Sequence, residues 1–307
     1  MAVSYTEHEI TSGGARVVLS VWASAAPEAA IMFVPATMVH PLFYEALLHG
    51  FAERGFAVVG LHPVGHGKSP REVKRYTIRD IVGNGRDAVT FALERFGLPV
   101  IAFGSSQGGV VAAVLAAEDG RLAAAFPHNL LLTELPQSIY VSRFPRWLRH
   151  LYRPTRGVFK FCARILPDLA LPLDFYMKRE RISTSREIWD KVGGDPLCLT
   201  RYPLHFLGSL FTTEFPGLTD GSVRCPVYVV ADSGDKLFTA DYTRLVFERL
   251  RAPHKELVVF DFNDHMLMVS HPSEVSERLA GKMREALRLH SSVCASWTAT
   301  PPSTAVP

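Results

Sequence analysis

Short, uninterrupted apolar runs alternate with longer amphipathic stretches along the first half of the chain. The apolar runs cover residues 15–22, 30–34, 56–61, 100–103 and 122–126, and helical patterns fill residues 42–54, 78–96 and 107–118 between them. The alternation returns near the C-terminus, with strand patterns at 226–230 and 256–260 and helical patterns at 240–251 and 272–289. Strands that are apolar on both faces and separated by helices form parallel sheets with helices on both sides. The sequence therefore predicts an α/β fold on a mostly parallel sheet.

The alternation of strand and helix patterns is interrupted between residues 131 and 222, where arginine, proline and aromatic residues are frequent and the pattern is helical. We interpret residues 131–222 as a helical cap inserted over the carboxyl edge of the sheet, and residues 1–130 and 223–290 as the core. Residues 291–307 contain no charged side chain and are rich in Ser, Thr, Ala and Pro, so we expect a disordered tail there.

The composition excludes several classes of protein. A chain of 307 residues, 48% of them hydrophobic, can bury a large core and is not intrinsically disordered. Its 33 basic and 30 acidic residues give a net charge of +3, which does not favour binding to nucleic acid. The N-terminal sequence MAVSYTEHEI has no apolar signal segment, and the longest apolar run, residues 110–117, is far shorter than the ~20 residues of a bilayer span. We therefore expect a cytoplasmic protein.

No metal site or cofactor is predicted. The four cysteines are scattered and form no CxxC pair, which argues against zinc or a redox dithiol. His62 and His66 flank a glycine turn in the sequence HPVGH, but no cluster of carboxylates accompanies them.

The sharpest local motif is Gly104-Ser105-Ser106-Gln107-Gly108, between a predicted strand and a predicted helix. A G-x-S-x-G pentapeptide in this context forms a tight turn that exposes the hydroxyl of its central serine above the sheet. We expect Ser106 to be a nucleophile. The Gln107 N–H at the start of the helix is expected to stabilise an oxyanion.

A serine nucleophile needs a general base, and the base needs an orienting acid. Polar residues follow two late strands: Asp232 and Asp235 after the strand at 226–230, and His265 after the strand at 256–260. In open α/β sheets, ligands bind at these carboxyl ends. Asp235 lies farther out in its loop than Asp232 and reaches better toward His265. We expect Asp235 to be the acid and Asp232→Asn to have little effect.

The second oxyanion donor is expected in the loop after the strand at 30–34. Pro35 has no N–H, so we assign the Thr37 N–H, with the Thr37 hydroxyl as an extra donor. We further expect five residues to contact the substrate: Ala36, Met38, Ser105, Trp147 and Met266.

Over residues 15–289 the chain resembles the α/β-hydrolase superfamily, and within it is similar to the capped serine hydrolases grouped with monoacylglycerol lipases and lysophospholipases. Residues 104–108 resemble the nucleophile elbow, residues 62–69 the D-x-x-G-H-G-x-S loop, and residues 226–235 the strand that ends on the acid. Residues 264–265 resemble the G-H of the catalytic histidine, and Asp195-Pro196-Leu197 resembles a D-P-L of many such lids. The chain departs from the usual pattern at residues 35–36, where His-Gly is usual, at His62, where Asp is usual, and at Asp232, where Gly is usual.

The beginning of the cap is basic and aromatic. Residues 136–167 contain no Asp or Glu, but seven Lys or Arg interleaved with Tyr, Phe and Trp. Such a stretch is typical of an ordinary lid helix with solvated arginines; alternatively, it contacts an anionic membrane surface or an amphiphile with a negative head.

Together these features predict a serine hydrolase that cleaves an ester of a hydrophobic acyl group, with a small-molecule or lipid-like substrate. The alternatives are a thioesterase or amidase with the same triad, a C–C hydrolase or perhydrolase, and a non-catalytic binding protein with this fold.

Overall fold

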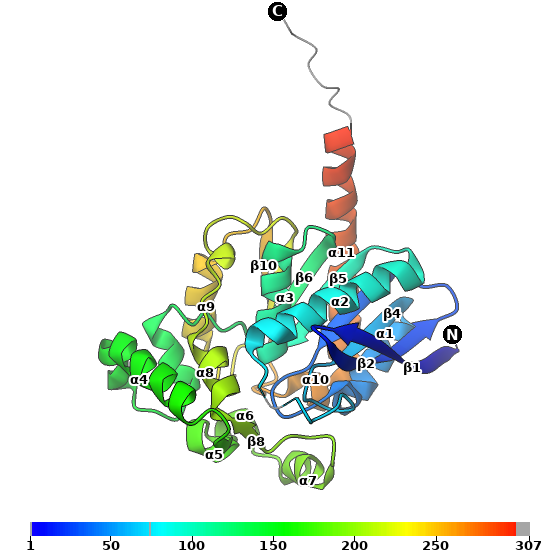
Figure 1. Ribbon diagram of the computed structural model, residues 1–307. Coiled ribbons are helices and arrows are strands. Elements are labelled where there is room, and N and C mark those ends of the chain that lie inside the picture. Colours follow the sequence, from blue (N-terminus) through cyan, green and yellow to red (C-terminus); the bar gives the residue numbers. More distant parts are fainter. Residues whose placement is uncertain (1, 74, 299–307) are drawn as a thin grey trace, which may run out of the picture.

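A single eight-stranded sheet forms the centre of the molecule (Figure 1), in a computed structural model that describes residues 2–73 and 75–298. The strands follow the order β1-β2-β4-β3-β5-β6-β9-β10. Their bounds are β1 Val3–Ser12, β2 Ala15–Ser24, β3 Ala29–Val34, β4 Phe56–His62, β5 Val100–Ser105, β6 Leu122–His128, β9 Val227–Asp232 and β10 Lys255–Phe260. From β4 to β10 all neighbouring strands are parallel, whereas β2 is antiparallel to both β1 and β4. The predicted, mostly parallel sheet is confirmed.

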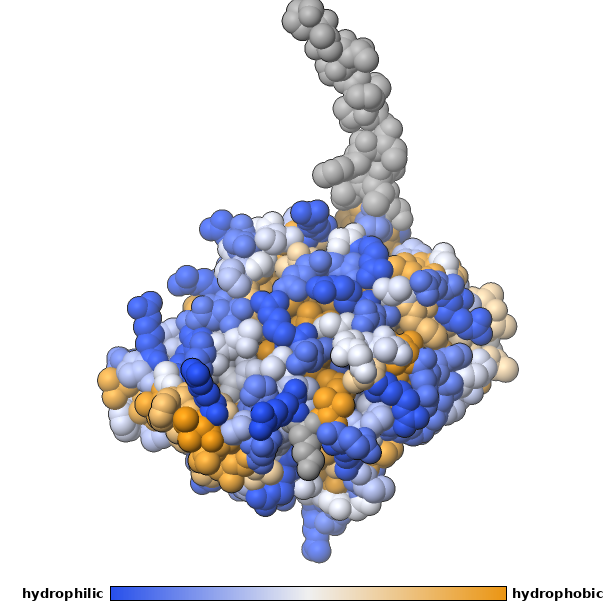
Figure 2. Space-filling model, in the orientation of Figure 1, coloured by the Kyte–Doolittle hydropathy of each residue, from blue (hydrophilic) through white to orange (hydrophobic). Residues whose placement is uncertain are grey.

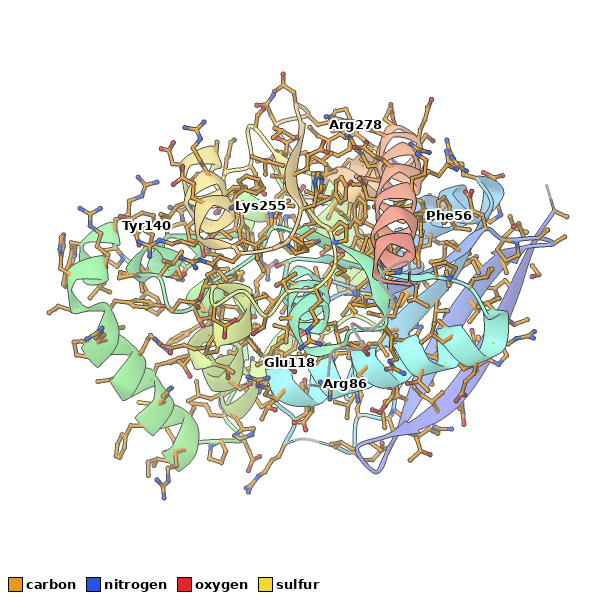
Figure 3. All side chains as sticks on the ribbon, turned by 90° about the horizontal axis from the view of Figure 1, so that it is seen from above. Phe56, Arg86, Glu118, Tyr140, Lys255 and Arg278 are labelled. Atoms are coloured by element: carbon orange, nitrogen blue, oxygen red, sulfur yellow. The ribbon has the colours of Figure 1, made fainter. Side chains whose placement is uncertain are left out.

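Helices cover both faces of this sheet (Figures 1 and 3). α1 packs against α11 on one face, and α2 packs against α3 on the other. Arg79 and Arg86 of α2 both pair with Glu118 at the end of α3, at 2.5 and 3.1 Å between nitrogen and oxygen. Figure 3 labels Arg86 and Glu118. The core helices are η1 Pro41–Tyr44, α1 Glu45–Glu53, α2 Ile78–Phe96, α3 Gln107–Glu118, α9 Ala240–Arg249, α10 Leu267–Ser270 and α11 Pro272–Thr298.

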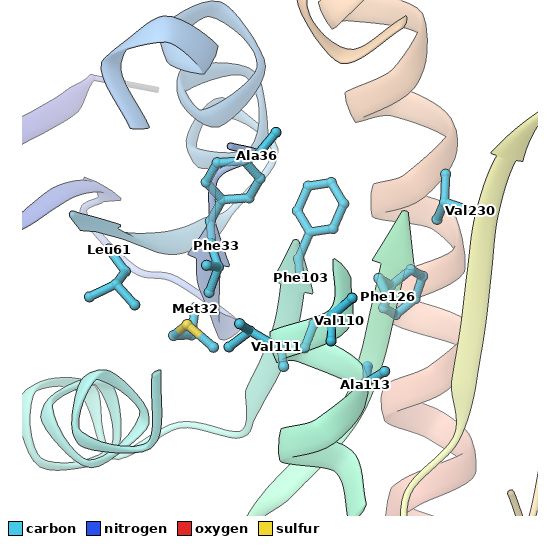
Figure 4. Packing of buried hydrophobic residues seen from close by; sticks show 14 of the residues in the cluster. Met32, Phe33, Ala36, Leu61, Phe103, Val110, Val111, Ala113, Phe126 and Val230 are labelled. Atoms are coloured by element: carbon cyan, nitrogen blue, oxygen red, sulfur yellow. The ribbon is translucent and has the colours of Figure 1, made fainter. Parts of the chain in front are cut away.

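Apolar side chains from adjacent strands fill the space between the layers (Figure 4). Phe33 of β3 and Phe103 of β5 are fully buried, with ring centroids 5.2 Å apart. Val111 of α3 lies among the side chains on the other face of these strands. Strands this deeply buried read as continuous apolar runs, which is why the sequence identified them.

The insertion between β6 and β9, here called the cap, is mainly helical and lies to one side of the sheet (Figure 1). It comprises η2 Pro136–Val141, η3 Arg146–Leu151, α4 Tyr152–Ile165, β7 Ala170–Pro172, α5 Leu173–Tyr176, α6 Arg179–Ile182, α7 Arg186–Gly194, β8 Arg201–Pro203, α8 Leu204–Thr212 and η4 Pro216–Leu218.

Three features differ from the sequence-based expectations. β1 was not predicted, because it is an edge strand with mostly exposed polar side chains and lacks an apolar run. The antiparallel pair β7 and β8 in the cap is too short, at three residues each, to show a strand pattern. α11 continues to Thr298, so residues 291–298, expected in a disordered tail, are helical. Residues 299–307 of that expected tail lie outside the described residues.

Candidate active site

Ser106 occupies the sharp turn between β5 and α3. Its backbone has φ 52° and ψ −112°, a conformation that a residue other than glycine rarely adopts, and its N–H donates to the His128 carbonyl at 2.8 Å. The flanking glycines permit the turn. A Cβ on Gly104 would lie 2.1 Å from the Gly108 oxygen, and one on Gly108 would lie 2.0 Å from the Val34 oxygen. The pentapeptide therefore forms the strained strand-to-helix turn that the sequence predicted.

The structure brings Asp235 and His265 together across the loops that follow β9 and β10. The His265 Nδ1 and the Asp235 Oδ2 lie 2.7 Å apart, and both residues are buried. The other carboxylate oxygen, Oδ1, accepts hydrogen bonds from the N–H groups of Leu237 and Phe238 at 2.6 and 2.9 Å. Burial raises the pKa of Asp235, but the nearby His265 and these hydrogen bonds outweigh it, so the pKa lies below its ordinary value. An ionised Asp235 accepts from Nδ1–H and so leaves Nε2 of His265 as the free base.

Asn129 is a further neighbour of this pair that sequence reasoning missed. It follows β6 with a left-handed backbone, φ 57°, and its Nδ2 donates to the Asp235 Oδ2 at 2.9 Å. The Asp235 carboxylate therefore accepts four hydrogen bonds in total, which fix its orientation. The sequence around Asn129 carries no motif, but its position after a parallel strand was a usable signal.

Two small cavities meet at Ser106, with volumes of about 30 and 20 Å³. Thr37 lines both, His265 lines the first and Gln107 lines the second. The predicted nucleophile, base and both oxyanion residues thus line these two cavities, which share Ser106 and Thr37. Gln107 stands at the N-terminus of α3, where backbone N–H groups and the helix dipole favour a negative charge.

The five predicted substrate contacts divide into two groups. Ala36, Met38 and Met266 line the 30 Å³ cavity beside Ser106 and His265.

Ser105 and Trp147 do not line either of the two cavities. Ser105 is buried, with its hydroxyl 3.0 Å from the His128 Nδ1, because successive strand residues point to opposite faces. Trp147 lies on η3 with 61% of its surface exposed, so its placement at the substrate is corrected.

A larger cavity of about 510 Å³ lies in the cap and is lined mainly by apolar residues of η2, η3, α4, β7, α5 and α8 and of the segments on either side of η2. Leu131 and Phe211 line both this cavity and the 20 Å³ cavity at Ser106, so the two spaces adjoin. The volume falls in the range of about 300–1,000 Å³ that is usual for small-molecule sites. The sequence indicated a cap but not this cavity, since side chains from six separate elements contribute to its walls.

Asp232 has a structural role that the sequence did not indicate. Its side chain is buried, and its carboxylate accepts hydrogen bonds from three backbone N–H groups: Gly234 at 2.9 Å, Phe262 at 2.7 Å and Asp264 at 3.3 Å. Gly234 belongs to the loop of the acid, whereas Phe262 and Asp264 belong to the loop of the histidine. Asp232 therefore ties together the two loops that carry Asp235 and His265, and the expectation that Asp232→Asn has little effect is revised.

Asp232→Asn is expected to lower stability by about 1–3 kcal/mol, because the amide NH₂ would face a backbone N–H and leave it unpaired. Turnover per folded molecule is expected to fall less than for a change at Asp235. Urea unfolding together with active-site titration measures both quantities. An Asp232→Asn protein as stable as the wild type would show that the carboxylate does not hold the loops.

The histidines of the HPVGH sequence have structural partners. The His62 Nδ1 accepts from the Lys68 N–H at 3.1 Å and its Nε2 lies 3.0 Å from the Ser20 hydroxyl, while the His66 Nδ1 lies 2.8 Å from the Val64 carbonyl. Burial lowers the pKa of His62 to about 3 and that of His66 to about 4, so both are neutral.

A different group of residues could supply metal ligands. His40, Asp195 and Cys198 bring potential ligand atoms within 4.8 Å of one another. The His40 Nε2 and the Asp195 Oδ2, however, form a hydrogen bond of 2.7 Å. Burial also raises the pKa of the Cys198 thiol to about 12, which opposes the thiolate that a metal requires. These features favour a hydrogen-bonded contact between the core and the cap over a metal site.

Among the helices in residues 2–73 and 75–298, none combines the length and the apolar character needed to span a membrane.

The model of the Hydrolase_4 family, described as serine aminopeptidase, S33, matches residues 25–271 of the sequence. The search of curated proteins found no match.

Solved structures share the fold at low sequence identity. A soluble variant of the monoglyceride lipase from Saccharomyces cerevisiae has a TM-score of 0.72 at 12% identity, covering 92% of this chain and 94% of that one. The monoacylglycerol lipase of Paleococcus ferrophilus has 0.65 at 18% identity, over 92% and 99% of the two chains. A carboxyl esterase from Bacillus coagulans has 0.67 at 16% identity, over 94% and 99%. These likenesses confirm the predicted α/β-hydrolase fold.

Proposed function

The chain belongs to the Hydrolase_4 family of α/β hydrolases, and from this membership and the site geometry we propose that it is a serine hydrolase cleaving carboxylic esters of hydrophobic acyl groups. One observation carries the proposal. Ser106 and His265 line one cavity, and His265 is held by a buried, hydrogen-bonded Asp235. Acyl transfer by a serine requires a base beside the nucleophile and an acid that orients the base.

In the proposed reaction, the Ser106 oxygen attacks the ester carbonyl while the His265 Nε2 takes the serine proton. The Thr37 and Gln107 N–H groups stabilise the oxyanion of the tetrahedral intermediate. His265 then donates the proton to the alcohol, which leaves an acyl group on Ser106. Water, activated by His265, attacks the acyl group and releases the acid, and the proton returns to Ser106. Asp235 stabilises the charged imidazole in both half-reactions.

The apolar cavity of the cap supports a hydrophobic acyl group. It adjoins the space at Ser106 through Leu131 and Phe211, and a chain of methylene groups gains free energy on leaving water for such a cavity. The same triad can cleave a thioester or an amide, so these remain the nearest alternative substrates.

A panel of acyl esters, thioesters, amides and monoacylglycerols of increasing chain length tests the proposal, run on wild type and Ser106→Ala. A serine-directed fluorophosphonate gives an independent readout on the same two proteins. Ester turnover that depends on Ser106 supports the proposal. Hydrolysis confined to thioesters or amides would replace it, as would peroxide-dependent or diketone-cleaving activity. A folded protein in which Ser106 is not labelled would favour a binding role.

The outer face of the cap supports a proposed contact with anionic lipid. Exposed apolar side chains gather over the region of α4 and α5 (Figure 2). Four of them, Phe144, Leu151, Val158 and Phe175, also line the cap cavity, which therefore opens on this face. Five others do not line it: Trp147, Phe161, Ile165, Leu166 and Leu169. Basic residues accompany them, and none of the described ion pairs involves Arg153, Lys160 or Arg164. An amphipathic surface of this kind binds anionic lipid through both apolar insertion and charge.

Binding to vesicles that contain phosphatidylserine is therefore expected to exceed binding to neutral vesicles and to fall as salt rises, because exposed charges are screened beyond about 8–10 Å at ordinary ionic strength. Phe161→Ser together with Ile165→Ser, at two exposed residues that do not line the cap cavity, should weaken binding, measured by vesicle co-sedimentation. Val259→Thr, at an exposed apolar residue of β10, is the matched control. Equal, salt-independent binding to both kinds of vesicle would leave the cap as an ordinary lid.

A further inference from the structure

The loop between β3 and η1 carries Thr37, the proposed oxyanion donor, and has an unusual backbone at the next residue. Met38 has φ 74°, in the left-handed region that residues other than glycine and asparagine seldom occupy. Both Thr37 and Met38 line the cavity at Ser106. A strained backbone beside a reacting group persists only when its surroundings hold it in place.

The cap supplies those surroundings. The Met38 N–H donates to the hydroxyl of Tyr202 at 2.7 Å, and the Met38 carbonyl accepts from the Leu199 N–H at 2.7 Å. Both backbone groups of Met38 are therefore bonded to one cap segment, residues 195–202. Two residues along the loop, the His40 Nε2 lies 2.7 Å from the Asp195 Oδ2 of the same segment. The Asp195 Oδ1 accepts from the Leu197 N–H at 2.8 Å, which shapes the turn.

Tyr202 is itself held rigidly. It is fully buried in β8, and its ring lies against His66 and Phe206, with centroid distances of 5.5 and 5.2 Å. Its partner strand β7 places Leu171 opposite it. The hydroxyl therefore presents a fixed acceptor to the Met38 N–H.

This hydrogen bond has a consequence for the chemistry. With its N–H directed at Tyr202, Met38 cannot donate to the substrate, whereas the N–H of the preceding residue, Thr37, is the proposed oxyanion donor. Without the hydroxyl, the Met38 N–H would be buried and unpaired, and the left-handed turn at Met38 would lose one of its two restraints.

We infer that the cap segment 195–202, chiefly through the Tyr202 hydroxyl, positions the oxyanion loop. Tyr202 is on this view a positioning residue, and the cap completes the catalytic site as well as covering it. The inference rests on the proposed function, since it assigns a cause to the placement of the proposed donor.

Tyr202→Phe tests the inference, because it removes the hydroxyl and keeps the ring. We expect kcat to fall about 10- to 100-fold, less than the ~10²–10³ that follows loss of an oxyanion donor, with KM within about twofold. Affinity for an alkyl trifluoromethyl ketone, which forms an oxyanion adduct with the serine, should fall by the same factor as kcat. Affinity for the matching methyl ketone should not change.

Tyr228→Phe is the matched control: Tyr228 is fully buried in β9, and its hydroxyl has no hydrogen-bond partner among the described residues. It should keep wild-type kcat and ketone affinity. If Tyr202→Phe does not fold, Asp195→Ala tests the same segment and should also weaken trifluoromethyl ketone binding selectively.

A folded Tyr202→Phe protein with wild-type kcat and wild-type affinity for the trifluoromethyl ketone would overturn the inference. So would a Tyr228→Phe protein that loses as much kcat and ketone affinity as Tyr202→Phe does. Where only Asp195→Ala folds, unchanged affinity for the trifluoromethyl ketone would overturn it. Activity that survives Ser106→Ala would instead refute the proposed function, so the two failures are distinguishable.

Discussion

Replacement of Ser106 by alanine is expected to lower ester turnover by about 10⁴-fold or more, the scale seen when a member of a catalytic triad is removed. The change deletes the oxygen that attacks the carbonyl, and it removes the only side-chain group that His265 would activate. The Ser106→Ala protein should still fold, because the Ser106 side chain makes none of the described hydrogen bonds that hold the turn. Steady-state kinetics and fluorophosphonate labelling measure the loss.

Ser105→Ala is the matched control for that experiment. The Ser105 hydroxyl lies 3.0 Å from the His128 Nδ1, inside the body of the molecule. Burial lowers the pKa of His128 to about 3, so this histidine is neutral and its contact with Ser105 is structural. We expect Ser105→Ala to retain most of the activity. A large loss from Ser105→Ala with little from Ser106→Ala would move the nucleophile to Ser105.

Asp235→Asn is expected to lower turnover by about 10³–10⁴-fold, since a neutral amide holds neither the correct imidazole tautomer nor its positive charge. The structure strengthens this expectation. The Asp235 carboxylate accepts all four of its hydrogen bonds, from His265, Asn129, Leu237 and Phe238. An amide NH₂ would oppose at least one of these donors. Single-turnover kinetics with an activated ester measures the effect on acylation directly.

Asp232→Asn separates a catalytic role from a loop-holding one. At Asp235 the loss should appear in turnover at saturating substrate, whereas at Asp232 it should appear chiefly in the free energy of unfolding. A large catalytic loss from Asp232→Asn, with Asp235→Asn near wild type, would reverse the assignment of the acid.

Local patterns in the sequence were sufficient for the sheet and for the three proposed catalytic residues. The strands β3, β4, β5, β6 and β9 are buried along their whole length, so each is an apolar run, and the residues after them lie at one edge of a parallel sheet. Ser106 lies in a turn whose two glycines are required by direct backbone contact. Asp235 and His265 follow neighbouring strands, so their proximity followed from strand order alone.

Other features depended on contacts that leave no local pattern. Nothing in the sequence distinguishes Asn129 from any polar residue after a strand, or Asp232 from a second candidate acid. Trp147, expected at the substrate, is exposed, because the face that a cap helix turns inward depends on what it packs against.

The parallel sheet and the nucleophile turn could be read from the sequence, because each arises from hydrophobic periodicity or backbone sterics within a few residues. The completion of the site depends on tertiary contacts. Met38 and Tyr202 stand 164 positions apart in the chain, and their hydrogen bond exists because the cap folds back onto the oxyanion loop. The cap cavity likewise exists only where side chains of six elements leave space between them. Periodicity is a property of neighbours in sequence, whereas these contacts are properties of packing between distant segments.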